Sequence, residues 1–213
     1  MTPNIKFRPW ALLVPVAGAM SFLALYFVAT LYYPGGSQAD TNSTGFSWKD
    51  NYWCNLLADQ AINGATNKAQ PIAVSSMFVL SATLAFFWVL LPSFLYSGNR
   101  IGTIIRVSGL LSMATALLLY SNFSHDTIIN LASTFGVIAT SGTLIALYKT
   151  RHFMLFAFGL AIIVLVGLNN YFYYGGGGIE PLPVVQKITF VSYLLWICAI
   201  SVVMFRKANA ALP

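Results

Sequence analysis

Long apolar runs alternate with short polar connections along the whole chain. Six of the runs are long enough to cross a membrane as helices, because a bilayer core about 30 Å thick needs roughly 20 apolar residues for each crossing. They cover residues of about 10–33, 71–96, 101–120, 128–148, 153–174 and 184–205. Proline and glycine punctuate the connections, as in Pro34-Gly35-Gly36 and the glycine run at 175–178, and such residues end helices. The pattern predicts an all-α fold, a polytopic membrane bundle of six transmembrane helices that forms a single domain over residues 1–213.

The longest polar connection, residues 34–70, carries a helical pattern of its own. Its first third is rich in Gly, Ser, Thr and Asn and is predicted to be loose. Further on, Ser47 followed by Asp50 resembles a capping box, which begins a helix. Apolar residues then recur on one helical face at Trp48, Tyr52, Trp53, Leu56 and Leu57. The spacing predicts a short amphipathic helix in the first outer loop, ending near Asn63-Gly64, which either covers a site as a lid or anchors the loop at the membrane surface.

The composition agrees with a membrane protein and excludes several other classes. The chain is 58% hydrophobic and 8% charged, which is too little charge to cover a water-soluble globule of 213 residues. Cys54 and Cys198 are too few for a disulfide scaffold, and His125 and His152 are predicted at opposite faces of the membrane, so they cannot share a zinc ion. P-loop and Gly-x-Ser-x-Gly motifs are absent from the sequence. We therefore predict no metal, no cofactor and no nucleic-acid partner.

The distribution of charge indicates the orientation of the chain. With six spans, one side carries Lys6, Arg8, Arg100, Arg106, Lys149, Arg151, Arg206 and Lys207. The other side carries only Lys49, Lys68 and Lys187 among the bases, together with Asp40, Asp50, Asp59, Asp126 and Glu180. Basic loops of membrane proteins stay in the cytoplasm. We therefore predict a multi-pass protein of the cell inner (plasma) membrane with both termini cytoplasmic.

A histidine and a carboxylate stand side by side between the third and fourth runs, in the stretch Ser121-Asn122-Phe123-Ser124-His125-Asp126-Thr127. Histidine exchanges protons near neutral pH. His125 and Asp126 are therefore the candidate catalytic pair, with His125 as acid or base and Asp126 orienting it or binding a cation. The alternative is that the pair lies in the hydrated headgroup layer without a catalytic role.

Other polar residues gather on the same predicted outer side. Asp126, Asn130, Ser133 and Thr134 form one stripe down the fourth helix. Polar side chains at membrane depth face the bundle interior or a water-filled cavity, because lipid offers them no hydrogen-bond partners. The predicted ligand pocket on the outward face is formed by Asn51, Asn55, Asp59, Asn130, Ser133, Asn169, Asn170 and Gln186. The alternative for the Asn, Ser and Thr residues is ordinary hydrogen bonding between packed helices.

Three short motifs resemble a known family. They are Asn51-Tyr52-Trp53-Cys54-Asn55-Leu56-Leu57, then His125-Asp126, and finally Leu182-Pro183-Val184-Val185-Gln186-Lys187-Ile188. Over nearly the whole chain they resemble bacterial six-span proteins of the domain of unknown function 998 family. The resemblance implies six spans and implies that Asn51, Asn55, His125 and Asp126 are the polar positions of the family. Distantly similar eukaryotic membrane proteins are associated with lipid remodelling or lipid asymmetry, so the resemblance favours a role with lipids.

Two functions are compatible with these features. The first is an integral membrane protein that binds or processes a lipid-like molecule at an outward-facing polar pocket, with membrane lipids as its partners. The alternative is a non-catalytic accessory or structural subunit whose helices bind another membrane protein. Whether the protein is an enzyme stays open, because the His125-Asp126 pair is the only arrangement in the sequence that points to a reaction.

Overall fold

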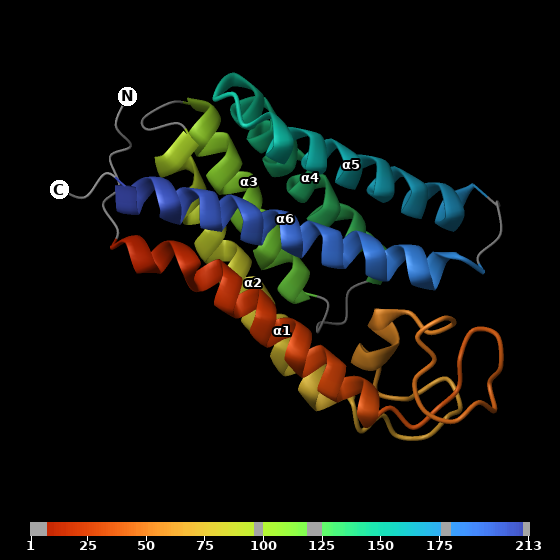
Figure 1. Ribbon diagram of the computed structural model, residues 1–213. Coiled ribbons are helices and arrows are strands. Elements are labelled where there is room, and N and C mark those ends of the chain that lie inside the picture. Colours follow the sequence, from red (N-terminus) through yellow and green to blue (C-terminus); the bar gives the residue numbers. More distant parts are fainter. Residues whose placement is uncertain (1–7, 96–99, 119–124, 176–179, 211–213) are drawn as a thin grey trace. The chain divides into compact units, whose positions relative to one another are not determined.

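The computed structural model describes residues 8–95, 100–118, 125–175 and 180–210. In chain order, their helices are η1 (Pro9–Leu13), α1 (Val14–Leu31), η2 (Trp53–Leu57), α2 (Gln70–Leu95), α3 (Arg100–Leu117), α4 (His125–Lys149), α5 (Phe153–Tyr174) and α6 (Leu182–Ala210) (Figure 1). Among the described residues, six helices are long and apolar enough to cross a membrane. The prediction of an all-α, multi-pass membrane protein with six spans is therefore confirmed.

The helices begin and end close to the predicted positions. Pro71 lies in the first turn of α2, where its missing N–H has no hydrogen bond to lose. Between α4 and α5, Arg151 has a left-handed φ of 59°, which closes the predicted basic turn. The largest difference is at α6, whose 29 residues continue through Lys207 to Ala210. At 1.5 Å per residue this helix is about 44 Å long, so its ends reach beyond a hydrocarbon layer of about 30 Å.

The described chain groups into two compact units, which are considered separately. Unit 1 consists of Met1–Ala19, Phe78–Leu160 and Leu195–Pro213. Unit 2 consists of Met20–Met77 and Ala161–Leu194. The prediction that the whole chain forms one domain stays a prediction.

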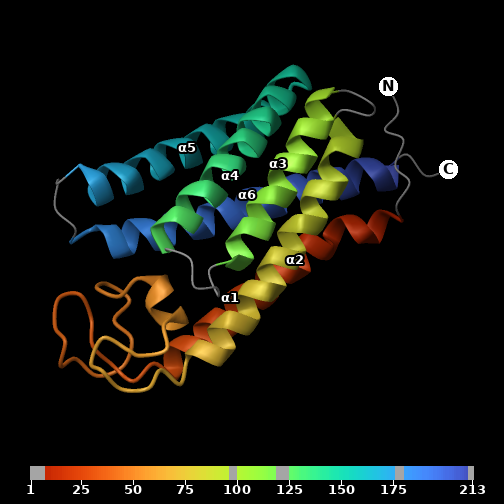
Figure 2. The same cartoon turned by 180° about the vertical axis from the view of Figure 1, so that it is seen from behind.

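Unit 1 is built on close helix packing at small residues. In both views α3 and α4 lie side by side (Figures 1 and 2). Ser112 on α3 donates a hydrogen bond to the carbonyl oxygen of Ala132 on α4 at 2.8 Å. On α3, a Cβ atom added to Gly109 would overlap the indole ring of Trp88. Small residues thus allow the close approach on which helix association in membranes depends.

Unit 2 contains an ordered segment that we call the cap, residues 34–69. The cap lies beside the C-terminal end of α1, as both views show (Figures 1 and 2). Gly35 pairs with Thr44 in an isolated antiparallel bridge, and Gly36 donates to the carbonyl oxygen of Ser43 at 2.7 Å. The prediction of a loose first third is therefore wrong. Gly36 has a φ of 81°, and a Cβ atom on it would collide with the main chain at Ile62 and Asn63, so glycine is required there.

The predicted helix of the cap is present in a shorter form. It is the 3₁₀ helix η2, which covers Trp53–Leu57 rather than starting at Ser47 and ending near Asn63. Ser47 does accept from the main-chain N–H of Asp50 at 3.1 Å, but this bond closes a turn instead of starting a helix. The reason is that the Asn55 side chain takes up the main-chain N–H of Tyr52, which in such a helix would bond to the carbonyl of Trp48. Side-chain hydrogen bonds of this kind compete with helix formation.

Candidate functional site

Asn51 is the centre of the hydrogen bonding in the cap. It is fully buried. Its Oδ1 accepts from the main-chain N–H of Ser47 at 2.7 Å, and its Nδ2 donates to the carbonyl oxygen of Gly36 at 2.8 Å. A longer contact of 3.5 Å joins Nδ2 to Oδ1 of Asn55. Because its amide is used in these bonds, Asn51 connects separate parts of the cap to one another.

Lys187, near the start of α6, fixes the cap from the other side. The side chain is 7% exposed. Its Nζ donates to the carbonyl oxygens of Asn51 at 2.6 Å and Pro183 at 2.7 Å, and it lies 5.9 Å from the centre of the Phe46 ring. Buried charges need polar partners, and here two main-chain carbonyls and an aromatic face provide them. Next to it, Gln186 accepts from the main-chain N–H of Trp53 at 3.2 Å.

Asn67 stabilises the C-terminal end of η2. Its Nδ2 lies within hydrogen-bond distance of the carbonyl oxygens of Asn55, Leu56 and Ala58, at 3.1, 3.2 and 2.8 Å. The last carbonyls of a helix have no partner within the helix, so the buried Asn67 amide takes that place. Its Oδ1 also accepts from the main-chain N–H of Ala69, just before α2 begins. Asn67 therefore joins η2 to the start of α2.

An aromatic cluster lies beneath these polar groups within unit 2. It consists of Phe22 and Tyr26 from α1, Trp53 from the cap and Phe190 from α6. The Trp53 ring lies 5.2 Å from Tyr26 and 5.5 Å from Phe190 between ring centres. The Tyr26 hydroxyl donates to the carbonyl oxygen of Trp53 at 3.2 Å. Edge-to-face pairs at these distances are favourable, so Trp53 fixes the cap to two helices.

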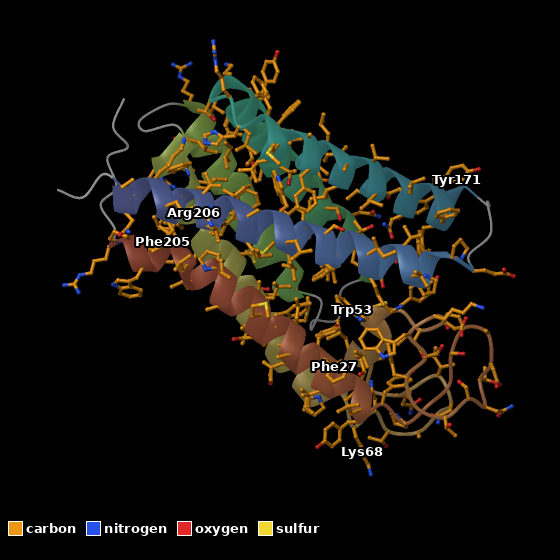
Figure 3. All side chains as sticks on the ribbon, viewed as in Figure 1. Phe27, Trp53, Lys68, Tyr171, Phe205 and Arg206 are labelled. Carbon is orange, nitrogen blue, oxygen red and sulfur yellow. The ribbon has the colours of Figure 1, made fainter. Side chains whose placement is uncertain are left out.

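A second aromatic group is exposed. Trp48 of the cap stacks on Phe27 of α1, with ring centres 6.2 Å apart and planes 28° apart. Phe46 packs edge-on against Trp48 at 5.5 Å. Trp48 is 47% and Phe27 54% exposed. In Figure 3, Phe27 lies on α1 and Trp53 on the cap. We call Phe27 and Trp48 the exposed aromatic pair.

Cys54 lies next to Trp53 in η2 and is the thiol of the cap. Burial raises the pKa of the Cys54 thiol, while hydrogen bonds and the nearby Lys187 ammonium oppose part of this effect. At neutral pH the group is therefore a protonated thiol, which is a poor nucleophile and metal ligand. Among the described residues, no group of three or more His, Cys, Asp or Glu side chains could hold a metal ion.

Three of the residues predicted for the ligand pocket meet in unit 2. Asn51, Asn55 and Gln186 all lie in the network that joins the cap to α6. Each of the three forms hydrogen bonds with the protein's own main chain. Asp59 is exposed and accepts from the Gln70 side chain at 2.6 Å, at the start of α2.

Two further predicted pocket residues lie on α5. Asn169 donates to the hydroxyl oxygen of Thr189 on α6 at 2.6 Å and to the carbonyl oxygen of Leu165 at 2.9 Å. This is a hydrogen bond between packed helices, the alternative to a ligand pocket for the Asn, Ser and Thr residues. Asn170 is exposed, and its side chain donates to the carbonyl oxygen of Val166 in its own helix at 2.9 Å. Asn169 thus connects two neighbouring helices.

The remaining predicted site residues belong to unit 1. His125 begins α4, and neither its side chain nor residues 121–124 lie within the described part of the structure. Asp126 is in the first turn of α4, where a carboxylate interacts favourably with the helix dipole. Asp126, Asn130 and Ser133 are all exposed, as is Thr134. The assignment of this stripe to an outward-facing, water-filled pocket stays a prediction.

Sequence reasoning missed the residues that do most to hold the cap. Lys187 was counted only as a charge, although a lysine among apolar residues at the start of a span signals a buried or paired group. Asn67 stands three residues before Gln70-Pro71, a position suited to a turn that leads into a helix. Searches of family models, curated proteins and solved structures give no match to this chain, so the resemblance to the domain of unknown function 998 family stays a prediction.

Proposed function

We propose that this is a plasma-membrane protein with both termini in the cytoplasm, whose cap faces outward and binds a lipid-like molecule of the outer leaflet. The observation that carries the proposal is the exposed aromatic pair, in which Trp48 of the cap stacks on Phe27 of α1. The proposal concerns binding. His125 and Asp126 are the residues predicted to act on a bound molecule, and the experiments below test them separately.

The position of Phe27 supports contact with lipid. It lies on α1, four residues before the helix ends at Leu31, and its ring is exposed. Exposed side chains of a membrane-crossing helix contact lipid near the ends of the span, where Trp and Tyr are the preferred residues. Since Trp48 stacks on Phe27, its indole shares that level. The cap therefore extends one aromatic side chain into the interfacial layer.

The neighbours of Trp48 suit the chemistry of a lipid headgroup. Lys49, the next residue after Trp48, is exposed. On either side of these two residues, the Ser47 hydroxyl donates a hydrogen bond to the Asp50 carboxylate at 2.8 Å. An amphipathic ligand has an apolar part that packs on aromatic rings and a polar part that needs donors and acceptors. Both kinds of group occur together on this edge of the cap.

Native mass spectrometry of the protein released from membranes tests the proposal. Wild-type protein should retain phospholipid, and Trp48→Ala should retain less. A lost aromatic contact of about 1 kcal/mol corresponds to about fivefold weaker binding. Trp10→Ala is the matched control, because Trp10 is also exposed, at 62%, but belongs to η1 rather than the cap. Equal retention by wild type and Trp48→Ala would contradict the proposal.

His125→Ala and Asp126→Ala form a separate arm of this experiment. If these variants retain lipid normally while Trp48→Ala does not, the cap binds lipid and the histidine and aspartate play no part in binding. If all three lose lipid, the predicted pocket includes the start of α4. Orientation is tested by labelling single cysteines with a membrane-impermeant maleimide. A cysteine at Gly45 should react in intact cells, whereas one at Asn209 should react only after lysis.

A second candidate function rests on α5. Only 11% of its most apolar window is buried, the lowest value of the six spans. Met154, Val164 and Tyr171 are among its exposed large side chains. Such a face suits an accessory subunit that packs against another membrane protein. Affinity purification in mild detergent distinguishes the two candidates, because an accessory subunit co-purifies with a partner in stoichiometric amount.

A further inference from the structure

The C-terminal end of α6 makes a specific contact with the turn between α4 and α5, within unit 1. Lys207 Nζ lies 2.8 Å from Nε2 of His152. On the other side of the ring, Nδ1 lies 2.8 Å from Oγ1 of Thr150. The Thr150 hydroxyl also lies 2.8 Å from the carbonyl oxygen of Ala146, which can only accept. The imidazole is thus held at both nitrogens.

These partners determine where the protons are. A lysine ammonium is a donor without acceptor capacity, so Nε2 of His152 must carry a lone pair. The Thr150 hydroxyl gives its single proton to Ala146, so Nδ1 of His152 carries the proton and donates to Thr150. The arrangement therefore requires a neutral imidazole in its Nδ1–H form. Once Nε2 is protonated, the contact with Lys207 becomes a repulsion between two donors.

The turn keeps His152 in place whichever form it takes. The main-chain N–H groups of Thr150 and His152 donate to the carbonyl oxygens of Ala146 and Leu147, each at 2.9 Å. Arg151 supplies the left-handed residue that closes a helix end, with a φ of 59°. Lys207 has no comparable constraint, because it is an exposed residue three positions before α6 ends. Because Ala208 is buried, a broken contact frees the Lys207 side chain and the exposed residues Asn209 and Ala210 at the end of α6.

Among the described residues of unit 1, no carboxylate side chain lies at this place to offset a second positive charge. The charged groups on the facing elements are Lys149 and Arg151 around the turn, and Arg206 and Lys207 on α6. The facing group from α2 is the ring of Phe94, whose centre is 6.3 Å from the His152 ring and 5.5 Å from Lys207 Nζ. The sequence of unit 1 contains one acid, Asp126, at the opposite end of the 25-residue helix α4.

We propose that His152 and Lys207 form a pH-sensitive latch, which ties the end of α6 to the α4–α5 turn while His152 is neutral and releases it when His152 is protonated. Both residues lie at the ends of spans, and on the predicted orientation they face the cytoplasm. The latch makes the mobility of the C-terminal end respond to acidification there. It does not depend on the lipid binding proposed above, and it is tested without any ligand.

The direction of the pH effect follows from the environment of the ring. Partial burial lowers the pKa of His152, and the charge of Lys207 lowers it further. The folded protein therefore prefers the neutral form more strongly than an unfolded chain does. The contribution of this contact to stability is complete at a pH above the ordinary histidine pKa of about 6.5, and it is lost as the pH falls below that pKa.

Nitrogen-15 NMR of the histidine ring tests the proton assignment. The chain has two histidines, so His125→Gln leaves His152 as the only signal from protein in nanodiscs. The wild-type ring should be in the Nδ1–H form at pH 8. Lys207→Met should raise the pKa of His152, so that the ring becomes protonated at a higher pH than in the wild type, whereas Lys207→Arg should preserve the wild-type pKa. Arg206→Met is the control, because it removes a neighbouring positive charge but keeps Lys207, and it should leave the tautomer of His152 unchanged. Arg206 is labelled in Figure 3.

A distance measurement tests the release itself. Spin labels on Lys149→Cys and Asn209→Cys, in a Cys54→Ser, Cys198→Ser background, should move apart between pH 8 and pH 5. His152→Gln is the key comparison, because a glutamine oxygen accepts from Lys207 but does not titrate in this range. Its label distance should stay short at both pH values. An Nε2–H ring in the wild type, or an equal pH response in His152→Gln, would overturn the latch.

Discussion

Lys187 Nζ lies 2.6 Å from the main-chain carbonyl oxygen of Asn51, so a charged side chain of the last helix holds a residue 136 positions earlier in the chain. Lys187→Met should lower the free energy of unfolding of the cap by about 1.5–3 kcal/mol, the range for hydrogen bonds to charged groups. Limited proteolysis between residues 34 and 69 measures the effect. Lys68→Met, at an exposed lysine of the same segment, is the control and should change little. Equal protease resistance of the two variants would show that the contact contributes no stability.

Asn67→Ala should destabilise η2. The substitution leaves the carbonyl oxygens of Asn55, Leu56 and Ala58 without their side-chain donor. Unsatisfied buried acceptors cost about 1–3 kcal/mol, and a lower midpoint of thermal unfolding should report this. Asn42→Ala removes an exposed asparagine of the cap and should be close to neutral. A thermal midpoint for Asn67→Ala that equals that of Asn42→Ala would count against the role assigned to Asn67.

Gly36→Ala and Gly45→Ala form a matched pair. Both glycines have positive φ, 81° and 68°, so alanine suffers similar backbone strain of about 1 kcal/mol at each. A Cβ atom meets the main chain at Ile62 and Asn63 from Gly36 but meets nothing within 4 Å from Gly45. Gly36→Ala should therefore be the more destabilising by about 1–3 kcal/mol. A smaller loss of unfolding free energy for Gly36→Ala than for Gly45→Ala would contradict the packing described for the cap.

The reactivity of Cys54 should depend on pH in a defined way. Burial raises the pKa of Cys54, so the thiol stays protonated through neutral pH. Its contribution to stability is therefore present at a pH below the ordinary cysteine pKa of about 8.5. That contribution is lost as the pH rises through the higher pKa of the folded state. In Cys198→Ser protein, iodoacetamide should modify native Cys54 more slowly than unfolded Cys54 at pH 8.5. Equal rates in the native and the unfolded protein would contradict the burial described for Cys54.

The six spans were predictable because their signal is local. Apolar runs of about 20 residues, ended by Pro34-Gly35 or by basic turns such as the one at Lys149, define a membrane helix without reference to the rest of the chain. The one clear difference lies at the end of α6. Arg206 and Lys207 leave the apolar layer, but a helix has no need to end there, and α6 continues to Ala210.

The cap could be predicted only in part because its structure depends on side-chain bonds across the chain. The spacing of Trp53 and Leu56 correctly indicated two buried residues on one helical face. The same pattern placed the helix start at Ser47, whereas Asn55 takes the main-chain N–H of Tyr52, which such a helix needs. The periodicity of the sequence shows which side chains are apolar, but it does not show which asparagine side-chain oxygen accepts from which main-chain N–H group.

The candidate site shows the same limit. Asn51, Asn55 and Gln186 were predicted from polarity and, for the two asparagines, from the family resemblance. Asn51 contacts Asn55, and Gln186 accepts from the neighbouring Trp53. The bond from Lys187 to Asn51 was not predicted, because the two residues are too distant in sequence for any local pattern to reveal it. The exposed pairing of Trp48 with Phe27 is equally hidden, because the sequence placed these residues in different elements.

The bond between Lys187 and Asn51 also bears on how the chain is made. The cap leaves the ribosome long before α6 does, so during synthesis the Asn51 carbonyl and the Trp53 ring lack their partners Lys187 and Phe190. Contacts between distant parts of a chain form late, and unfinished surfaces are exposed to proteases in the meantime. A polypeptide that stops before α6 thus keeps an incomplete cap. Protease resistance of residues 34–69 becomes a signal that the last helix has been inserted.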